Sequence, residues 1–65
     1  ELVGAVLLHL NDSNPVVRGA AVWALATLDP ARFDAERLVR WPREIDPDVR
    51  EEWRYSAALA SNSSR

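Results

Sequence analysis

Apolar residues recur at helical spacing along nearly the whole chain. Within each segment they fall three and four positions apart, which places them on one face of an α-helix. No stretch alternates apolar and polar residues in the manner of a half-buried strand. The pattern therefore predicts an all-α fold, with helices over residues 2–10, 15–28, 30–41 and 47–60.

Two of these helices begin with the same local signal. A polar residue precedes a proline in Asn14-Pro15 and again in Asp46-Pro47. The Asn or Asp side chain can accept hydrogen bonds from the first free backbone N–H groups of the helix. Proline at the first helical position loses no hydrogen bond, because the N–H there has no partner within the helix. Both sites are therefore strong helix starts.

The start of the third helix is open to two interpretations. Asp29-Pro30 repeats the signal, but Asp34 could instead cap a shorter helix that follows a separate turn. Pro42 ends the segment, and we expect it to bias Trp41 away from helical geometry.

The apolar stripes predict the core. In the second helix the stripe is rich in Ala, so a neighbouring helix can approach closely, and its members are Val17, Ala20, Ala21, Ala24, Leu25 and Leu28. In the fourth helix the stripe consists of Val49, Trp53, Ala57 and Ala60. We expect Trp53 to be a core residue, because it lies on the stripe.

The two proline-led helix starts lie 32 positions apart, and each belongs to a short helix, turn, long helix unit. A helix pair that repeats at such a period is typical of α-solenoids. We therefore expect a HEAT-like superhelix fragment of four helices in two antiparallel pairs over residues 1–60. Residues 61–65 have no apolar anchor and are predicted to be a disordered tail. Solenoids need about three repeats for stability, so one face of the two units should be left exposed.

The composition excludes several kinds of functional site. The chain has no Cys and a single His, His9, which excludes disulfides, thiolate metal sites and multi-histidine sites. A net charge of −2 argues against autonomous nucleic-acid binding. The apolar run at residues 2–10 is too short to span a bilayer and lacks the features of a signal peptide. We expect a cytoplasmic protein without a membrane segment, and the first residue, Glu1, indicates a piece of a longer chain.

Two stretches resemble known families. The HEAT repeat of bacterial HEAT-like proteins is similar to the pattern Leu10-x-Asp12-x-Asn14-Pro15-x-Val17-Arg18-x-x-Ala21-x-x-Ala24-Leu25. A narrower resemblance, over about residues 2 to 60, is to the C-terminal extension of epoxyqueuosine reductases. The runs that carry it are Arg18-Gly19-Ala20-Ala21-Val22-Trp23-Ala24-Leu25 and Asp46-Pro47-Asp48-Val49-Arg50-Glu51-Glu52-Trp53.

The second resemblance implies a non-catalytic module. Enzymes of that family are oxidoreductases that complete queuosine synthesis on tRNA, with cobalamin and two [4Fe–4S] clusters held by an N-terminal catalytic part. Their HEAT-like extension helps to hold the tRNA anticodon arm. Iron–sulfur clusters need Cys thiolates, and this chain has none, so the resemblance implies that the redox chemistry lies in another part of the parent protein. The expected partners of this chain are the catalytic domain of its parent and tRNA. The alternative is a generic HEAT-type module for protein interaction or scaffolding.

One basic cluster with an aromatic residue inside it is the leading candidate for RNA contact. Its members are Arg32, Arg37, Arg40, Trp41 and Arg43. Arginines attract phosphates, and a tryptophan can stack on an unpaired base. The structural alternative is a solvated helix face on which the tryptophan fills the space between the repeats.

Arg18 and Arg50 occupy the same repeat position and are candidates for an inter-repeat ladder. The expected partners at the preceding turns are Asp12 and Asn14 for the first arginine, and Glu44 and Asp46 for the second. Phosphate contact is the functional alternative for both arginines.

Trp23 lies off the main stripe of its helix, on the side of Val16 and Gly19. A large ring one turn after a glycine indicates a second packed layer on this side. Exposure of the ring would mark it as an interface candidate. No phosphate-binding loop or nucleophile motif is present, and we expect no catalytic, cofactor-binding or metal-binding residue in this chain.

Overall fold

The computed structural model describes residues 2–63, with side chains as far as Leu59. Its elements are the helices α1 (Leu2–His9), α2 (Pro15–Leu28), α3 (Pro30–Arg40) and α4 (Pro47–Ser63), with the short 3₁₀ helix η1 (Trp41–Arg43) before α4. No strand occurs within residues 2–63. The all-α prediction and the order of the four helices are confirmed.

The cap-and-proline signals act as predicted at the two long helices. The Asn14 side-chain oxygen accepts a hydrogen bond from the N–H of Val16 at 2.9 Å. At the start of α4, Asp46 Oδ1 accepts from the N–H of Asp48 at the same distance. Each cap satisfies a backbone donor that the helix itself leaves unpaired.

The third helix begins at the earlier of its two candidate caps. Asp29 Oδ1 accepts from the N–H of Arg32 at 3.1 Å, so a start at Asp34 is wrong. The expected departure of Trp41 from helical geometry is also wrong, since this residue has φ −58° and ψ −44°. The chain tightens into η1 here, and a proline is tolerated in the first turn of such a helix because its missing N–H is not required.

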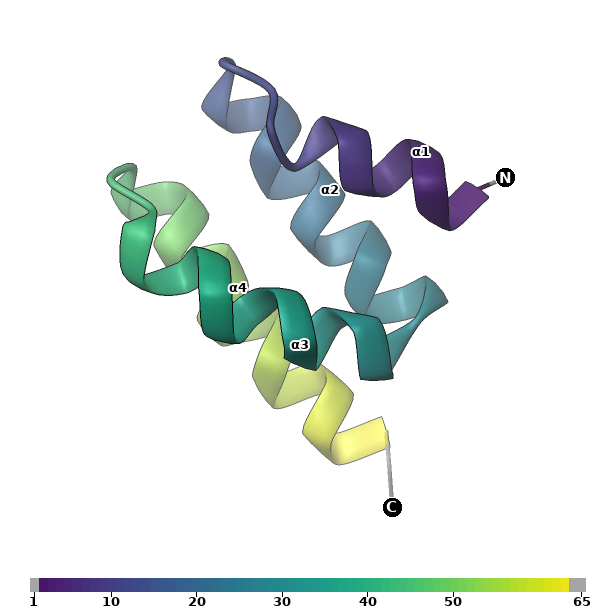
Figure 1. The fold of residues 1–65 in the computed structure, drawn as a ribbon. Helices are drawn as coiled ribbons and strands as arrows, with labels where there is room; N and C mark the ends of the chain where they lie inside the picture. The colour runs from purple at the N-terminus through teal and green to yellow at the C-terminus, as the bar shows by residue number, and fades with distance from the viewer. Residues whose placement is uncertain (1, 64–65) are drawn as a thin grey trace.

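The helices form two antiparallel pairs, α1 with α2 and α3 with α4 (Figure 1). The long helices α2 and α4 run in the same direction and pack along each other (Figure 1). Helix α2 is central, because α1, α3 and α4 all contact it.

The core lies between these helices. Its buried apolar members are Val6, Leu10, Ala21, Val22, Leu25, Phe33, Val49 and Trp53. The Phe33 and Trp53 rings lie 5.3 Å apart between centroids, which confirms the expectation for Trp53. Val22 is fully buried although it lies off the predicted stripe, because α2 is covered from more than one side. The predicted stripe is also wrong at its end, because Leu28, the last residue of α2, is exposed.

The last helix is longer than predicted. It ends at Ser63 rather than near residue 60, so residues 61–63 continue α4. The remaining residues of the expected tail, 64–65, lie outside the described part of the chain. Among the described helices, none is both long enough and apolar enough to cross a membrane.

Candidate interaction surfaces

The two units repeat the same hydrogen bonds 32 positions apart. In the first, the Asp12 carboxylate accepts from the N–H of Asn14 at 2.8 Å. In the second, the Glu44 carboxylate accepts from the N–H of Asp46 at 3.0 Å. The sequence repeat is therefore also a structural one.

The ladder arginines repeat their backbone contacts as well. Arg18 Nη1 donates to the carbonyl oxygen of Asp12 at 2.9 Å. Arg50 Nη1 donates to the carbonyl oxygens of Glu44 and Trp41, each at 3.0 Å. Both arginines thus close the turn that precedes their own helix.

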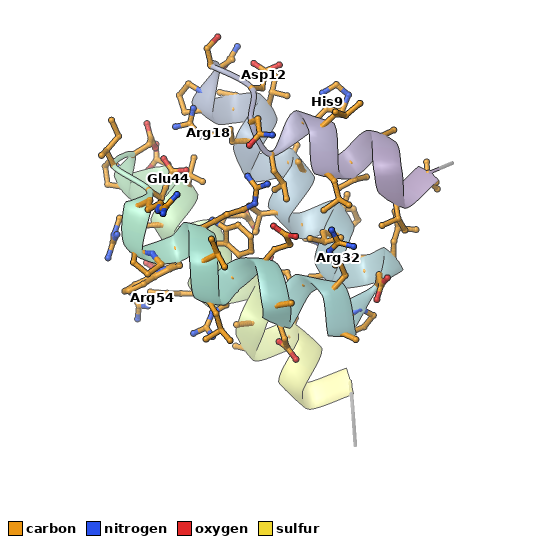
Figure 2. The ribbon with its side chains drawn as sticks, in the orientation of Figure 1. His9, Asp12, Arg18, Arg32, Glu44 and Arg54 are labelled. Carbon is orange, nitrogen blue, oxygen red and sulfur yellow. The ribbon has the colours of Figure 1, made fainter. Side chains whose placement is uncertain are left out.

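Beyond these contacts, Arg18 joins the two units. Its Nε and Nη2 donate to the two carboxylate oxygens of Glu44 at 3.0 and 2.8 Å, a bidentate pair with little exposure. The hydrogen bond from Arg18 is the main reason that the pKa of Glu44 lies below its ordinary value. The predicted pairing of Arg18 with Asp12 and Asn14 side chains is wrong, because the carboxylate of the next unit lies within reach (Figure 2).

Arg50 has a different environment from Arg18. Its guanidinium carbon lies 4.1 Å from the centroid of the Trp41 ring, in a cation–π contact. No carboxylate in the described part of the chain pairs with it, so the predicted side-chain pairs with Glu44 and Asp46 are wrong. The Asp46 carboxylate caps α4 instead.

Glu36 lies between two arginines of the predicted basic cluster and pairs with both. The two carboxylate oxygens of Glu36 accept hydrogen bonds from Arg40 Nε at 2.7 Å and from Arg32 Nε at 3.0 Å. The Arg40 and Arg32 hydrogen bonds lower the pKa of Glu36, the first more strongly. Arg40 also donates to the side-chain oxygen of Asn11 at 2.7 Å. These two arginines are therefore engaged within the protein.

Arg43 is exposed, but the groove that it borders has mixed charge. The charged residues that line this groove are Asp12, Arg18, Glu36, Arg40, Arg43 and Glu44. Three arginines and three acids leave no excess positive charge for a nucleic-acid phosphate. This side of the predicted cluster is therefore a poor RNA-binding surface.

Trp41 of the predicted cluster lies at a second surface, beside two arginines of α4. Trp41, Arg50 and Arg54 border one shallow hollow, with Pro47 and Glu51. Arg54 was not among the predicted contact residues, although its spacing of four from Arg50 on one helix places both on one face. Figure 2 shows Arg54 on the outer side of the molecule.

Two buried donor atoms lie at the end of α3 and the start of η1. Arg37 Nε and Trp41 Nε1 are buried and have no hydrogen-bond partner. Arg37 and Trp41 are four residues apart on consecutive helical turns, so they share a face. We name the set Trp41, Arg50 and Arg54 the basic–aromatic face.

The outer surface of the first unit is apolar. Trp23 is 51% exposed and Val16 is 77% exposed. Both belong to α2, whose one charged residue is Arg18. A side chain at Gly19, between them, would meet no atom within 4 Å. An exposed tryptophan on such a helix keeps Trp23 as the interface candidate.

No group of three His, Cys, Asp or Glu residues suited to a metal ion occurs within the described residues. Comparisons with protein-family models, curated proteins and solved structures found no match to this chain. The resemblance to epoxyqueuosine reductases therefore depends on the sequence runs quoted above.

Proposed function

We propose that this chain is a non-catalytic HEAT-like module of an epoxyqueuosine reductase, which docks on the catalytic part and assists binding of the tRNA anticodon arm. The observation that carries the proposal is the apolar outer surface of α2, where Trp23 is half-exposed on a helix with one charge. A helix that is apolar all round is normally covered by other protein. The quoted sequence resemblance supplies the identity of the covering protein.

In this proposal the redox chemistry belongs to the catalytic part of a cytoplasmic oxidoreductase. Cluster ligation requires Cys thiolates, and this chain contains no Cys. The residues of the chain therefore do not fit an iron–sulfur cluster, and no step of the reaction is assigned to them.

The basic–aromatic face is the surface that we assign to tRNA. Arg50 lies over Trp41 and is fixed there by its bonds to two carbonyl oxygens. Arg54 is exposed, and among the described residues its one ion-pair partner is Glu51, which is itself exposed. An exposed pair of this kind contributes little and can exchange its carboxylate for a phosphate.

A titration with a tRNA anticodon stem-loop, followed by NMR at low and at higher salt, tests this assignment. We expect salt-sensitive shifts at Trp41, Arg50 and Arg54, because phosphate binding weakens steeply with salt. Arg54→Gln should weaken binding and reduce the dependence of log affinity on log salt by about one. Arg32→Gln is the matched control, since Arg32 forms a comparable ion pair with Glu36 on α3, outside the basic–aromatic face.

The second candidate function is a HEAT-type protein-interaction module without an RNA ligand. The mixed charge of the groove beside Arg43 favours it. Equal effects of Arg54→Gln and Arg32→Gln, or no shifts at high stem-loop concentration, would contradict the tRNA assignment and leave this second function.

A further inference from the structure

Gly19 lies within α2, although the fold gives no reason for a glycine there. No described glycine has a positive φ, so the backbone does not require one at this position. A Cβ atom at Gly19 would meet no atom within 4 Å, so no neighbouring element approaches too closely for a side chain. Glycine inside a helix is also less favourable than alanine. The space beside Gly19 is therefore open, and packing within the chain does not explain it.

This space belongs to a groove between the N-terminal halves of α2 and α4, which pack along each other (Figure 1). The residues that line it include Val16, Gly19 and Ala20 from α2, and Asp48, Val49 and Glu52 from α4. The groove has a volume of about 210 Å³, below the roughly 300–1,000 Å³ of pockets that enclose a whole small molecule. It can therefore hold a single side chain of a partner protein.

The two walls of the groove have opposite chemistry at equivalent positions. Val16 and Ala20 of α2 are replaced 32 positions later by Asp48 and Glu52 of α4. These two acids lie four residues apart on one helix, so their like charges repel each other. The groove thus has one apolar wall and one acidic wall.

No cation of the described residues neutralises this acidic wall. None of the ion pairs of the chain includes Asp48 or Glu52. The Glu52 carboxylate accepts one hydrogen bond, from Ser56 Oγ at 3.1 Å. The positive end of the α4 dipole accounts for an acid at Asp48, in the first turn, but not for one at Glu52, which lies beyond that turn. The acidic wall is therefore complementary to a positive charge from outside the chain.

We propose that the groove binds one arginine or lysine side chain of the protein that covers α2. The apolar stem of this side chain lies along Gly19 and Ala20, and its charged end meets the carboxylates of the acidic wall. Arginine and lysine commonly bury their stems on apolar surface while the charge stays at a polar edge. Trp23, half-exposed one turn after Ala20, offers an apolar contact to the neighbouring residue of the partner. The proposal rests on the docking role proposed above and adds the chemistry of the segment that docks.

A model compound tests the groove on this chain. n-Butylguanidinium carries the charged end of an arginine on an alkyl stem, whereas guanidinium and n-butanol each carry one half of it. We expect n-butylguanidinium at millimolar concentration to shift the NMR signals of the Gly19, Ala20 and Val49 amides, and each half alone to shift them much less. Equal shifts with guanidinium would reduce the groove to an acidic patch, and equal shifts with n-butanol to an apolar one. Either result would overturn the proposal.

Matched substitutions locate the binding site. Gly19→Leu fills the groove and should abolish the shift at Val49, whereas Thr27→Leu adds the same side chain at an exposed site outside the groove and should retain it. Glu52→Gln removes one charge, keeps a hydrogen-bond acceptor and should weaken binding about fivefold. Its control is Glu51→Gln, which removes a neighbouring charge outside the groove.

Circular dichroism checks that each variant remains folded. Binding that survives Gly19→Leu, or that weakens equally in Glu51→Gln and Glu52→Gln, would also contradict the proposal. The docking role is judged separately, by solvent protection of Trp23 in the parent protein. Protection of Trp23 there, without binding of n-butylguanidinium here, would retain the docking role and reject the basic side chain.

Discussion

The two helix pairs share the same backbone arrangement, but the surface of the first pair is apolar and that of the second is charged. Along the helices of the first pair, residues 2–9 and 15–28, the one charged residue is Arg18. The second pair replaces apolar residues of α2 by charged ones at equivalent positions, among them Asp48 for Val16 and Arg54 for Val22. The polar outer face of the second pair is what a terminal, capping repeat needs. The first pair instead exposes apolar side chains, among them Val16 and Trp23.

The largest expected effect comes from the core that both pairs share. Trp53→Ala removes a ring that is 2% exposed and packs on Phe33. The loss should be about 3–5 kcal/mol of unfolding free energy, enough to unfold so small a domain. Circular dichroism should show loss of helix. Tyr55→Ala, at a 60% exposed site on the same helix, is the control and should stay folded.

The next effect separates the two turn acids. Glu44→Gln weakens the bidentate contact with Arg18 and should cost about 1–3 kcal/mol of unfolding free energy, measured by denaturant titration. Asp12→Asn keeps its local acceptor and should change the stability of the isolated chain much less. Equal losses for the two substitutions would show that the pair between the units adds nothing.

The contacts of these residues also show which features could be predicted from the sequence and which could not. Helix starts, the repeat period and the burial of Trp53 were predictable, because caps, prolines and stripe spacing act locally. The partner of Arg18 was not, because it depends on how closely α3 and α4 approach α2. Division of the basic cluster by Glu36 could have been predicted, because Arg32 and Arg40 each lie four positions from Glu36 on α3. The summed charge of the stretch did not show which groups meet.

A third prediction concerns pH. Arg18 holds the pKa of Glu44 below its ordinary value of 4.5, and Arg40 and Arg32 do the same for Glu36. Such a carboxylate stabilises the fold fully above about pH 4.5, and the contribution is lost as pH falls through the lowered pKa. The melting temperature should therefore decrease as the pH is lowered below about 4.5. Glu44→Gln should flatten this fall, and an unchanged profile would contradict the assigned cause.

The smallest effect is expected at the basic–aromatic face. Arg54 and Glu51 form an exposed pair, with side chains 66% and 61% exposed. Arg54→Ala should change the unfolding free energy by less than about 1 kcal/mol in a denaturant titration. A larger loss would mean that this surface is structural rather than available for a ligand.

The difference between the two pairs can be measured most directly by oxidative footprinting at Trp23 and its equivalent, Tyr55. Both side chains are exposed in this chain, at 51% and 60%. In the proposed parent protein, we expect Trp23 to be strongly protected relative to the isolated chain and Tyr55 to react at an unchanged rate. Equal reactivity of Trp23 in both proteins would contradict the assignment of the α2 surface as an interface.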